Sequence, residues 1–174
     1  MRGILNFARE EKVERSPTDI NALLSRAAEG ILATSPEGKF RVEFRLDPAL
    51  GSQMVDGGQL RQVFDNLLKN AGEAMPDGGT IRVATEEGEG EFTVTVSDTG
   101  AGIPEENLPK MFSPFFTTKK VGKGTGLGLS VCYGIVKMHG GTIQAANLPD
   151  GGACFTVRIR HFMPASAAVG VSQV

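Results

Sequence analysis

The sequence predicts an α/β fold, a two-layer sandwich in which about three helices cover a mixed β-sheet. Segments with apolar residues at helical spacing alternate along the chain with segments in which every second residue is apolar. Two pairs of the latter segments are separated only by short turns, as in β-hairpins. With 174 residues, the chain is long enough for one domain with a sizeable core. Helices that alternate with strands and hairpins are typical of a sheet with both parallel and antiparallel strands.

The first part of the chain contains a helical piece, one complete helix and two strands. Residues 4–13 have helical spacing but are too short to be stable alone, so we interpret them as the end of a longer helix. Residues 16–19 (SPTD) are a helix start signal, and residues 20–31 follow it with helical spacing. Alternation over residues 40–46 predicts a half-buried strand, and a short strand is expected around residues 54–55.

A long helix and a hairpin follow. Residues 58–75 carry a stripe of apolar side chains along one helical face, and residues 76–79 (PDGG) stop this helix. Residues 80–85 and 92–97 read as two strands joined by an acidic turn, which predicts a β-hairpin.

The last part of the chain begins with a long loop. Residues 98–125 are rich in Gly, Pro, Lys and Thr and show little periodicity, and a loop of this length in a small domain indicates a functional segment. A helix is predicted over residues 126–138, and strands over residues 142–147 and 154–159. Residues 161–174 have no pattern and are expected to be disordered.

The composition argues against several classes of protein. The net charge of −2 provides no strong field of one sign, so nucleic acid and acidic membrane surfaces are not expected partners. No apolar run reaches the roughly 20 residues that cross a bilayer, and the first residues do not predict a signal peptide. We therefore expect a cytoplasmic location, which is compatible with a membrane anchor elsewhere in a parent protein. Cys132 and Cys154 lack metal-ligand spacing and are interpreted as reduced apolar side chains.

Two asparagines of the predicted helix 58–75 suit a metal site. Asn66 and Asn70 lie four residues apart, so they share a face, and this face is not the apolar one. Amide oxygens are hard ligands suited to Mg²⁺, which takes one or two protein ligands together with phosphates and water. Glu73 follows one turn later on nearly the same side. A solvated polar helix face would give the same pattern and stays the alternative.

The run DTGAGI begins with a carboxylate directly after a predicted strand. The side chain of Asp98 at this place can accept a hydrogen bond from an exocyclic amine such as that of adenine. Gly100 and Gly102 allow a sharp turn and the close approach of a flat ring. A plain turn after a strand is the alternative interpretation.

Glycines are concentrated in residues 122–129 (GKGTGLGL), where the predicted helix 126–138 begins. Without side chains, backbone N–H groups can reach phosphate oxygens, and a helix N-terminus favours negative charge. The run is neither a Walker A loop nor a Rossmann fingerprint. Residues 112–120 (FSPFFTTKK) combine aromatic residues that can anchor a mobile flap with lysines that can meet phosphate. A flexible linker and an ordinary surface loop are the alternatives.

Taken in order, these runs resemble one family. NLLKNAGEAM, DTGAGI, FSPFFTTK, GKGTGLGLS and MHGG are similar to the N, G1, F, G2 and following glycine boxes of the histidine kinase catalytic domain. The resemblance covers about residues 18–160 and implies the Bergerat ATP-binding fold, which gyrase, Hsp90 and MutL ATPases share. It also implies a layout: a stub of a dimerisation helix with a linker over residues 1–15, the ATP-binding catalytic domain over residues 16–160, and a tail over residues 161–174.

The resemblance implies roles for individual residues. Asn70 would coordinate Mg²⁺ with support from Asn66, and Asp98 would bind the adenine amino group. Asn66, Asn70 and Lys119 form the implied catalytic set, in which Lys119 contacts phosphate. The implied nucleotide-binding residues are Asn70, Glu73, Asp98, Gly100, Gly102, Ile103, Phe112, Lys119, Lys123, Gly124, Thr125, Gly126, Leu127 and Gly128. Phe112, Phe115 and Phe116 would anchor the lid.

Two departures refine this picture. Asn66 stands where the ATPases of the superfamily have a general-base glutamate, and an amide is a poor base, so ATP should be protected from water. The chain has two histidines: His139 lies at a helix end, where the dipole favours a cation, and His161 begins the tail. Neither lies in a helical H-[ED] pair. The acceptor histidine is therefore expected outside this chain, which should bind ATP without phosphorylating itself.

The implied function is that of a protein-histidine kinase (EC 2.7.13.3) that uses ATP and Mg²⁺. The implied partners are the dimerisation domain of a parent kinase and the receiver domain of a response regulator, and we expect a monomeric fragment of a homodimeric parent. A Bergerat-type ATPase or an anti-sigma serine kinase is the second interpretation. Asn66 argues against the ATPase, and the helical stub together with the FFTTK run argues against the anti-sigma kinase. A non-catalytic nucleotide sensor or scaffold is the third, against which Asn70, Asp98 and the glycines argue.

Overall fold

The computed structural model describes residues 12–119 and 126–164 and confirms the predicted α/β sandwich. The elements are β1 (Ser16–Thr18), α1 (Ile20–Thr34), β2 (Phe40–Arg45), β3 (Gln53–Val55), α2 (Gly57–Glu73), β4 (Gly79–Glu87), β5 (Glu91–Asp98), the 3-10 helix η2 (Glu105–Asn107), α3 (Gly128–Met138), β6 (Thr142–Asn147) and β7 (Ala153–Arg160). Most of the helical piece predicted over residues 4–13 and most of the predicted tail lie outside the described residues.

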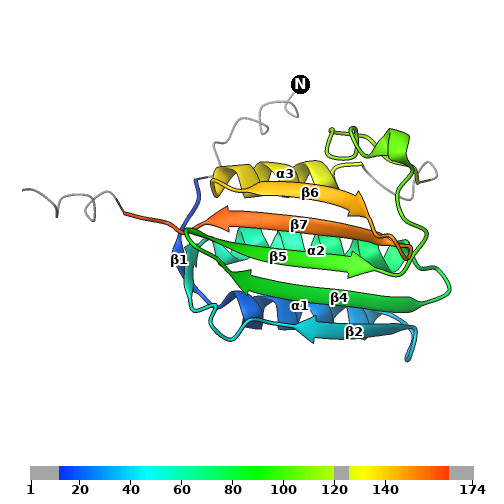
Figure 1. Cartoon of the computed structure of the whole chain (residues 1–174), viewed down its shortest axis with the longest axis horizontal. Helices are drawn as coiled ribbons and strands as arrows, with labels where there is room; N and C mark the ends of the chain where they lie inside the picture. The colour runs from blue at the N-terminus through cyan, green and yellow to red at the C-terminus, as the bar shows by residue number, and fades with distance from the viewer. Residues whose placement is uncertain (1–11, 120–125, 165–174) are drawn as a thin grey trace, which may run out of the picture.

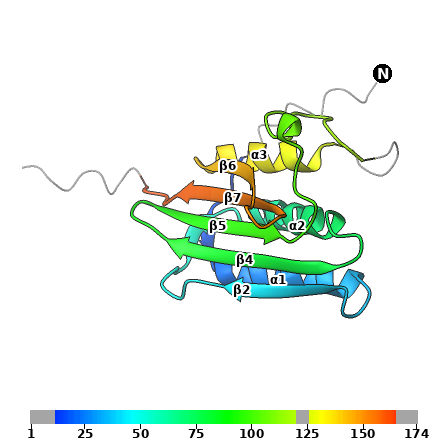
Figure 2. The ribbon, with the colours of Figure 1, turned by 45° about the vertical axis from the view of Figure 1, so that its right-hand side comes forward.

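Five strands form one sheet in the order β2-β4-β5-β7-β6. β2 and β4 run parallel, and the other neighbours run antiparallel, so the predicted mixed sheet is confirmed. Figures 1 and 2 show that α1, α2 and α3 all lie on the same side of this sheet. The sandwich therefore has two layers, and among the described elements no helix lies on the other face of the sheet.

Aspartates begin the first two helices. The carboxylates of Asp19 and Asp56 each accept a hydrogen bond from the N–H three residues later, at 2.9 and 3.1 Å. The predicted helix start is thus confirmed at Asp19, but the preceding residues Ser16–Thr18 pair with β3, with Pro17 opposite Met54. Proline is tolerated there because a two-stranded ribbon consists of edge strands only.

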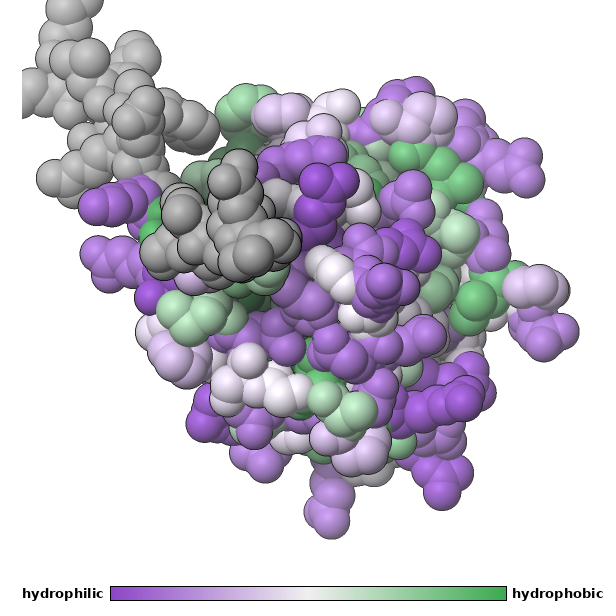
Figure 3. All heavy atoms as spheres, turned by 60° about the vertical axis from the view of Figure 1, so that its left-hand side comes forward, coloured by the Kyte–Doolittle hydropathy of each residue, from purple (hydrophilic) through white to green (hydrophobic). Residues whose placement is uncertain are grey.

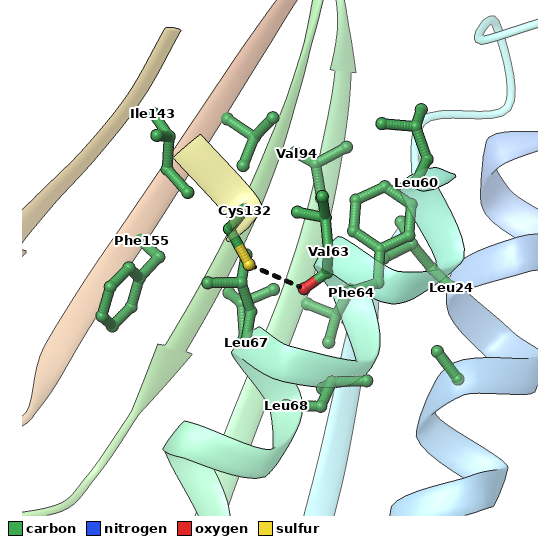
Figure 4. Packing of buried hydrophobic residues seen from close by; sticks show 14 of the residues in the cluster. Leu24, Leu60, Val63, Phe64, Leu67, Leu68, Val94, Cys132, Ile143 and Phe155 are labelled. Atoms are coloured by element: carbon green, nitrogen blue, oxygen red, sulfur yellow. Dashed lines mark hydrogen bonds between the residues drawn. The ribbon is translucent and has the colours of Figure 1, made fainter. Parts of the chain in front are cut away.

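The core lies between the sheet and the helices, and α2 packs between α1 and α3. Figure 4 shows the side chains of α2 that face α1 on one side and the strands on the other. The largest fully buried side chains are Phe64, Phe92, Ile20, Leu24, Leu60, Leu67, Leu68, Ile81, Ile159, Val63, Val83 and Val94. Because one side of α2 is committed to this core, its polar side is left to face a cleft.

Cys132 of α3 belongs to the core. Its Sγ donates a hydrogen bond to the carbonyl oxygen of Val63 at 3.8 Å, the dashed line in Figure 4. Burial raises the pKa of the Cys132 thiol to about 12. The thiol therefore stays protonated and behaves as a small apolar side chain, as the sequence predicts.

Two local predictions are wrong in their extent. Phe40 and Val42 pack on the core, but Phe44 is 46% exposed, because β2 is an edge strand that fewer side chains cover. α3 begins at Gly128 rather than at residue 126. Gly126 has a φ of +68°, and this left-handed backbone cannot continue a right-handed helix.

His139 is a neutral buried side chain, and its interpretation as a cation favoured by a helix dipole is wrong. Its Nδ1–H donates to the carbonyl of Ile135 at 2.8 Å, and its Nε2 accepts from the backbone N–H of Asp56 at 3.1 Å. Burial lowers the pKa of His139. The ring thus joins the end of α3 to the start of α2.

The surface is mainly polar on the face that Figure 3 presents, where hydrophobic areas are small and separate. Over the residues that the structure describes, no helix has the length and apolar character needed to span a bilayer.

Candidate functional site

A cleft of about 660 Å³ lies along the polar side of α2, where β5 ends. Its size suits a nucleotide-sized ligand. The predicted site residues that line it are Asn66, Asn70 and Glu73 from α2, Asp98, Gly102 and Ile103 at and after the end of β5, and Lys119, Gly126 and Gly128 before and at the start of α3. Three segments that are far apart in the sequence therefore meet at one site.

Other predicted site residues lie elsewhere. Gly100 is next to the cleft, where its N–H donates to Asp98 Oδ1 at 2.8 Å. Leu127 is the N-cap residue of α3. Phe112 packs edge-on against Phe155, with ring centroids 6.4 Å apart, and lines a smaller pocket beside β6. Lys123, Gly124 and Thr125 lie outside the described residues.

The amides of α2 contact the start of α3. Asn66, Asn70 and Glu73 follow one another by about one helical turn, which places them on one side of α2. Asn66 Nδ2 donates to the carbonyl of Gly128 at 3.5 Å. A Cβ at Gly128 would lie 3.5 Å from Asn66 Oδ1, so the amide and the helix start are in van der Waals contact. Both residues line the cleft, so the amide side of α2 and the start of α3 meet there.

Asp98 is a fixed hydrogen-bond acceptor inside the protein. It ends β5, an inner strand of the sheet, and is 2% exposed. Its Oδ1 accepts hydrogen bonds from the N–H groups of Gly100 at 2.8 Å and Ala153 at 3.4 Å. Burial raises the pKa of Asp98, and these two hydrogen bonds partly oppose the shift. Since the backbone orients the carboxylate, it can accept a polar hydrogen from a ligand in a defined direction.

Lys119 and Glu73 form an ion pair across the cleft. Lys119 Nζ contacts Glu73 Oε2, so the segment that carries the FFTTK run is held against α2. The two groups are about one-third exposed, at 37% and 35%. The pair therefore places a cation in the cleft and neutralises one of the carboxylates that line it.

The two ends of the segment between Phe115 and Gly126 touch each other. A Cβ at Gly126 would lie 2.6 Å from the carbonyl carbon of Phe115, so only glycine fits there. Phe115 has a φ of +64°, which is uncommon for a residue other than glycine. Phe115 is 72% exposed and Phe116 packs against the core, so of these two residues only Phe116 anchors the segment in this structure.

Several residues of the cleft were missed by sequence reasoning. They include Lys69, Pro104, Asn107 and Met111. A lysine on a polar helix face and an asparagine in a three-residue 3-10 helix have no periodic signal that separates a cleft residue from a solvated one. Asn147 was also missed: it is not one of the residues that line the cleft, and it hydrogen-bonds Ile103 from 44 positions further along the chain.

The chain belongs to the family of histidine kinase-, DNA gyrase B- and HSP90-like ATPases, whose model matches residues 55–162. This match spans more than half of the chain and explains why a cleft formed by α2, the end of β5 and the start of α3 is built from these motifs.

Similar proteins include a sporulation kinase and a sensor histidine kinase. The chain is 49% identical over 102 residues to sporulation kinase A of Bacillus subtilis, covering 59% of this chain and 16% of the relative. It is 36% identical over 154 residues to sensor histidine kinase ZraS of Klebsiella oxytoca, covering 88% of this chain and 33% of the relative. The chain thus spans a third or less of the length of these relatives.

Solved structures give the same assignment. The catalytic domain of histidine kinase ThkA matches with a TM-score of 0.77 and 34% identity, covering 85% of this chain and 96% of that domain. Histidine kinase ThkA in complex with the response regulator TrrA matches with a TM-score of 0.77 and 30% identity, covering 91% of this chain and 45% of that chain. The described fold is therefore that of a histidine kinase catalytic domain.

Proposed function

We propose that this chain is the ATP-binding catalytic domain of a sensor histidine kinase and presents the γ-phosphate of ATP to a histidine of a dimerisation domain. The observation that carries the proposal is the convergence of Asn70, Asp98 and Gly126 on one cleft. An amide, a buried carboxylate and exposed backbone can bind a metal, an adenine amino group and phosphate oxygens, respectively.

The orientation of the nucleotide follows from the two ends of the cleft. The adenine lies at the end formed by Asp98, Gly102 and Ile103. The phosphates lie at the end formed by Asn66, Asn70 and the start of α3, where the helix dipole favours negative charge. The ammonium group of Lys119 has three N–H donors, so it can contact a phosphate oxygen while it stays paired with Glu73. Lys123, Gly124 and Thr125 are assigned to phosphate binding by their place in the glycine-rich run, and Leu127 and Phe112 to the border of the nucleotide site.

A magnesium ion fits this arrangement. Among residues 12–119 and 126–164, no group of three or more His, Cys, Asp or Glu side chains is placed to hold a metal. Mg²⁺ needs no such cage when phosphates and water supply most of its ligands, and Asn70 offers one amide oxygen. The bound ion would neutralise phosphate charge.

The carboxylates that line the cleft are not free to promote hydrolysis of ATP. Of the described residues that line it, Glu73 is paired with Lys119, and Asp98 is buried with its Oδ1 held by backbone N–H groups. Neither is free to activate water, and Asn66 is no base. The residues position ATP and shield it, so a histidine of a partner domain is the acceptor in this proposal.

The partners follow from the same proposal. The dimerisation domain of a parent kinase supplies the histidine, and a response regulator receiver domain takes the phosphoryl group onward. The isolated chain is a monomer and its parent a homodimer, with this domain in the cytoplasm.

Transfer to an added dimerisation domain tests the function. We expect the chain with Mg²⁺ and γ-labelled ATP to label that domain on histidine, which gives an acid-labile product, and to leave itself unlabelled. A variant domain with its histidine replaced is the matched control. Acid-stable label on serine, or steady release of phosphate without an acceptor, would contradict the proposal.

A further inference from the structure

The side chain of Asn147 pairs with both backbone groups of Ile103. Asn147 Oδ1 accepts a hydrogen bond from the Ile103 N–H at 2.7 Å, and Asn147 Nδ2 donates to the Ile103 carbonyl at 2.7 Å. Asn147 is the last residue of β6, and Ile103 lies in the loop after β5. The side-chain amide of Asn147 therefore satisfies both backbone groups of Ile103, as a neighbouring strand would.

The first residue of β7 and the turn before it contact the start of the same loop. The N–H of Ala153 donates to Asp98 Oδ1 at 3.4 Å. A Cβ at Gly152 would lie only 1.9 Å from the carbonyl oxygen of Asp98, so the two backbones are in direct contact. The loop that begins at Asp98 is therefore fixed at its start by backbone contacts and at Ile103 by the Asn147 side chain.

Gly102 is adapted to this contact. Its φ is +77°, and a Cβ there would lie 2.9 Å from Asn147 Oδ1. A side chain at position 102 would push the amide away from Ile103. Gly102 and Ile103 both line the cleft, so the position of Asn147 sets the shape of the cleft wall without touching its interior.

We infer that Asn147 is a positioning residue for the base-binding end of the nucleotide cleft, acting through the backbone of Ile103. This inference rests on the proposed function. The phosphate end is formed by α2 and the start of α3, to which Asn147 makes no hydrogen bond. Loss of Asn147 therefore weakens binding of the base and leaves the metal-dependent part of ATP binding unchanged.

Calorimetry on the full 174-residue chain tests this with Asn147→Ala. We expect the affinities for ADP and ATP to fall by roughly tenfold, the size of effect expected when one or two hydrogen bonds that order a site are lost. The factor by which Mg²⁺ strengthens ATP binding should equal that of the parent. Asn147→Asp keeps an acceptor for the Ile103 N–H but has no donor for its carbonyl, so it should bind with intermediate affinity.

Gln144→Ala is the matched control, since Gln144 is an exposed amide of the same strand whose partner is Arg158, outside the cleft. It should bind nucleotide like the parent. Hydrogen exchange provides a readout that does not need nucleotide: the Ile103 amide should lose protection in Asn147→Ala and keep it in Gln144→Ala.

The outcomes separate the two proposals. If the parent chain fails to bind Mg-ATP, the proposed function is wrong. If the parent binds and Asn147→Ala binds equally well, the positioning role is wrong while the function stands. If the Mg²⁺ factor falls together with the ADP affinity and the unfolding midpoint, Asn147 serves general stability and the positioning role is also wrong.

Discussion

At the scale of single residues, two buried groups have shifted pKa values with opposite consequences for stability. Burial raises the pKa of Asp98 and lowers the pKa of His139, so the protein favours the neutral form of each. For the carboxyl, the neutral form is the protonated one, and for the imidazole it is the deprotonated one. Lowering the pH therefore raises the stability of the fold through Asp98 and lowers it through His139.

Asp98→Asn should separate stability from binding. The pKa of Asp98 is higher in the folded protein than in the unfolded chain. Stability therefore falls as the pH rises from the unfolded pKa through the folded pKa, because the carboxyl ionises more readily in the unfolded chain. The uncharged amide in the variant does not ionise, so this loss of stability is removed. We expect urea unfolding at pH 7 to show stability equal to or above that of the parent. ATP affinity should fall about a hundredfold, because the amide presents a donor to the adenine amine. A variant that binds ATP as tightly as the parent would refute the adenine assignment.

Asn70→Ala should affect metal-dependent binding most. Removing the amide oxygen takes away the protein ligand proposed for Mg²⁺, so the loss of affinity should be larger for Mg-ATP than for ATP in EDTA. Gln62→Ala, an exposed position of α2 outside the cleft, is the control and should change neither affinity. Equal losses with and without metal would argue against a metal ligand at Asn70.

The lowered pKa of His139 predicts that the protein loses stability in mild acid. Its folded pKa is lowered, so the unfolded chain binds the proton first, and stability falls as the pH drops below the unfolded value of about 6.5. The proton removes the acceptor for the Asp56 N–H. In a His161→Gln background, where His139 is the only histidine, urea midpoints between pH 7.5 and 5 should show this slope. His139→Gln in that background should lose it, and an unchanged slope would contradict the assignment.

At the scale of elements, α3 ends in a Schellman motif. The N–H of Gly140 donates to the Lys137 carbonyl and the N–H of Gly141 to the Val136 carbonyl, both at 2.9 Å. Gly140 has a φ of +72° with open space around it, whereas a Cβ at Gly141 would lie 2.3 Å from the Arg158 carbonyl oxygen. The first glycine is required by conformation, and the second by the close approach of β7.

Replacing each of the two glycines by alanine should therefore lower the free energy of unfolding by different amounts. Gly140→Ala should lower the free energy of unfolding by about 1 kcal/mol, the cost of a left-handed alanine. Gly141→Ala should cost more, about 2–4 kcal/mol, since the backbone of α3 or β7 has to move. Chemical unfolding of both variants checks this, and equal costs would show that the contact with Arg158 relaxes freely.

Elements with their own periodicity could be predicted from the sequence, and elements defined by partners could not. The stripe along α2 and the hairpin of β4 and β5 are local patterns, and the structure confirms them. β1 was missed because its one partner, β3, lies some 37 residues away, and proline argues against a strand. Phe44 was expected inside because alternation does not show that β2 is an edge strand.

At the scale of the whole molecule, the cleft is formed where separate parts of the chain meet. α2, the end of β5 and the start of α3 each contribute one wall. A ligand that contacts all of them binds the folded state only, so it must stabilise the fold as a whole by mass action.

Mg-ATP should therefore raise the unfolding midpoint. At a concentration 100 times the Kd, the expected gain is about 2.7 kcal/mol, or roughly 5–10 °C for a chain of this length. Scanning calorimetry at several ATP concentrations checks the logarithmic dependence. Asp98→Asn serves as the control and should show little shift at the same concentrations, whereas an equal shift in both proteins would place the nucleotide elsewhere.

The sequence by itself determined the class of fold, the order of the motifs and the residue types available for chemistry, because helical and strand periodicity and glycine spacing are local properties. Only the tertiary structure decided that His139 is neutral, that Lys119 pairs with Glu73 and that Asn147 holds Ile103. Burial, ion pairs and hydrogen bonds between distant residues depend on which segments fold against each other, and that is not written in any one stretch of the chain.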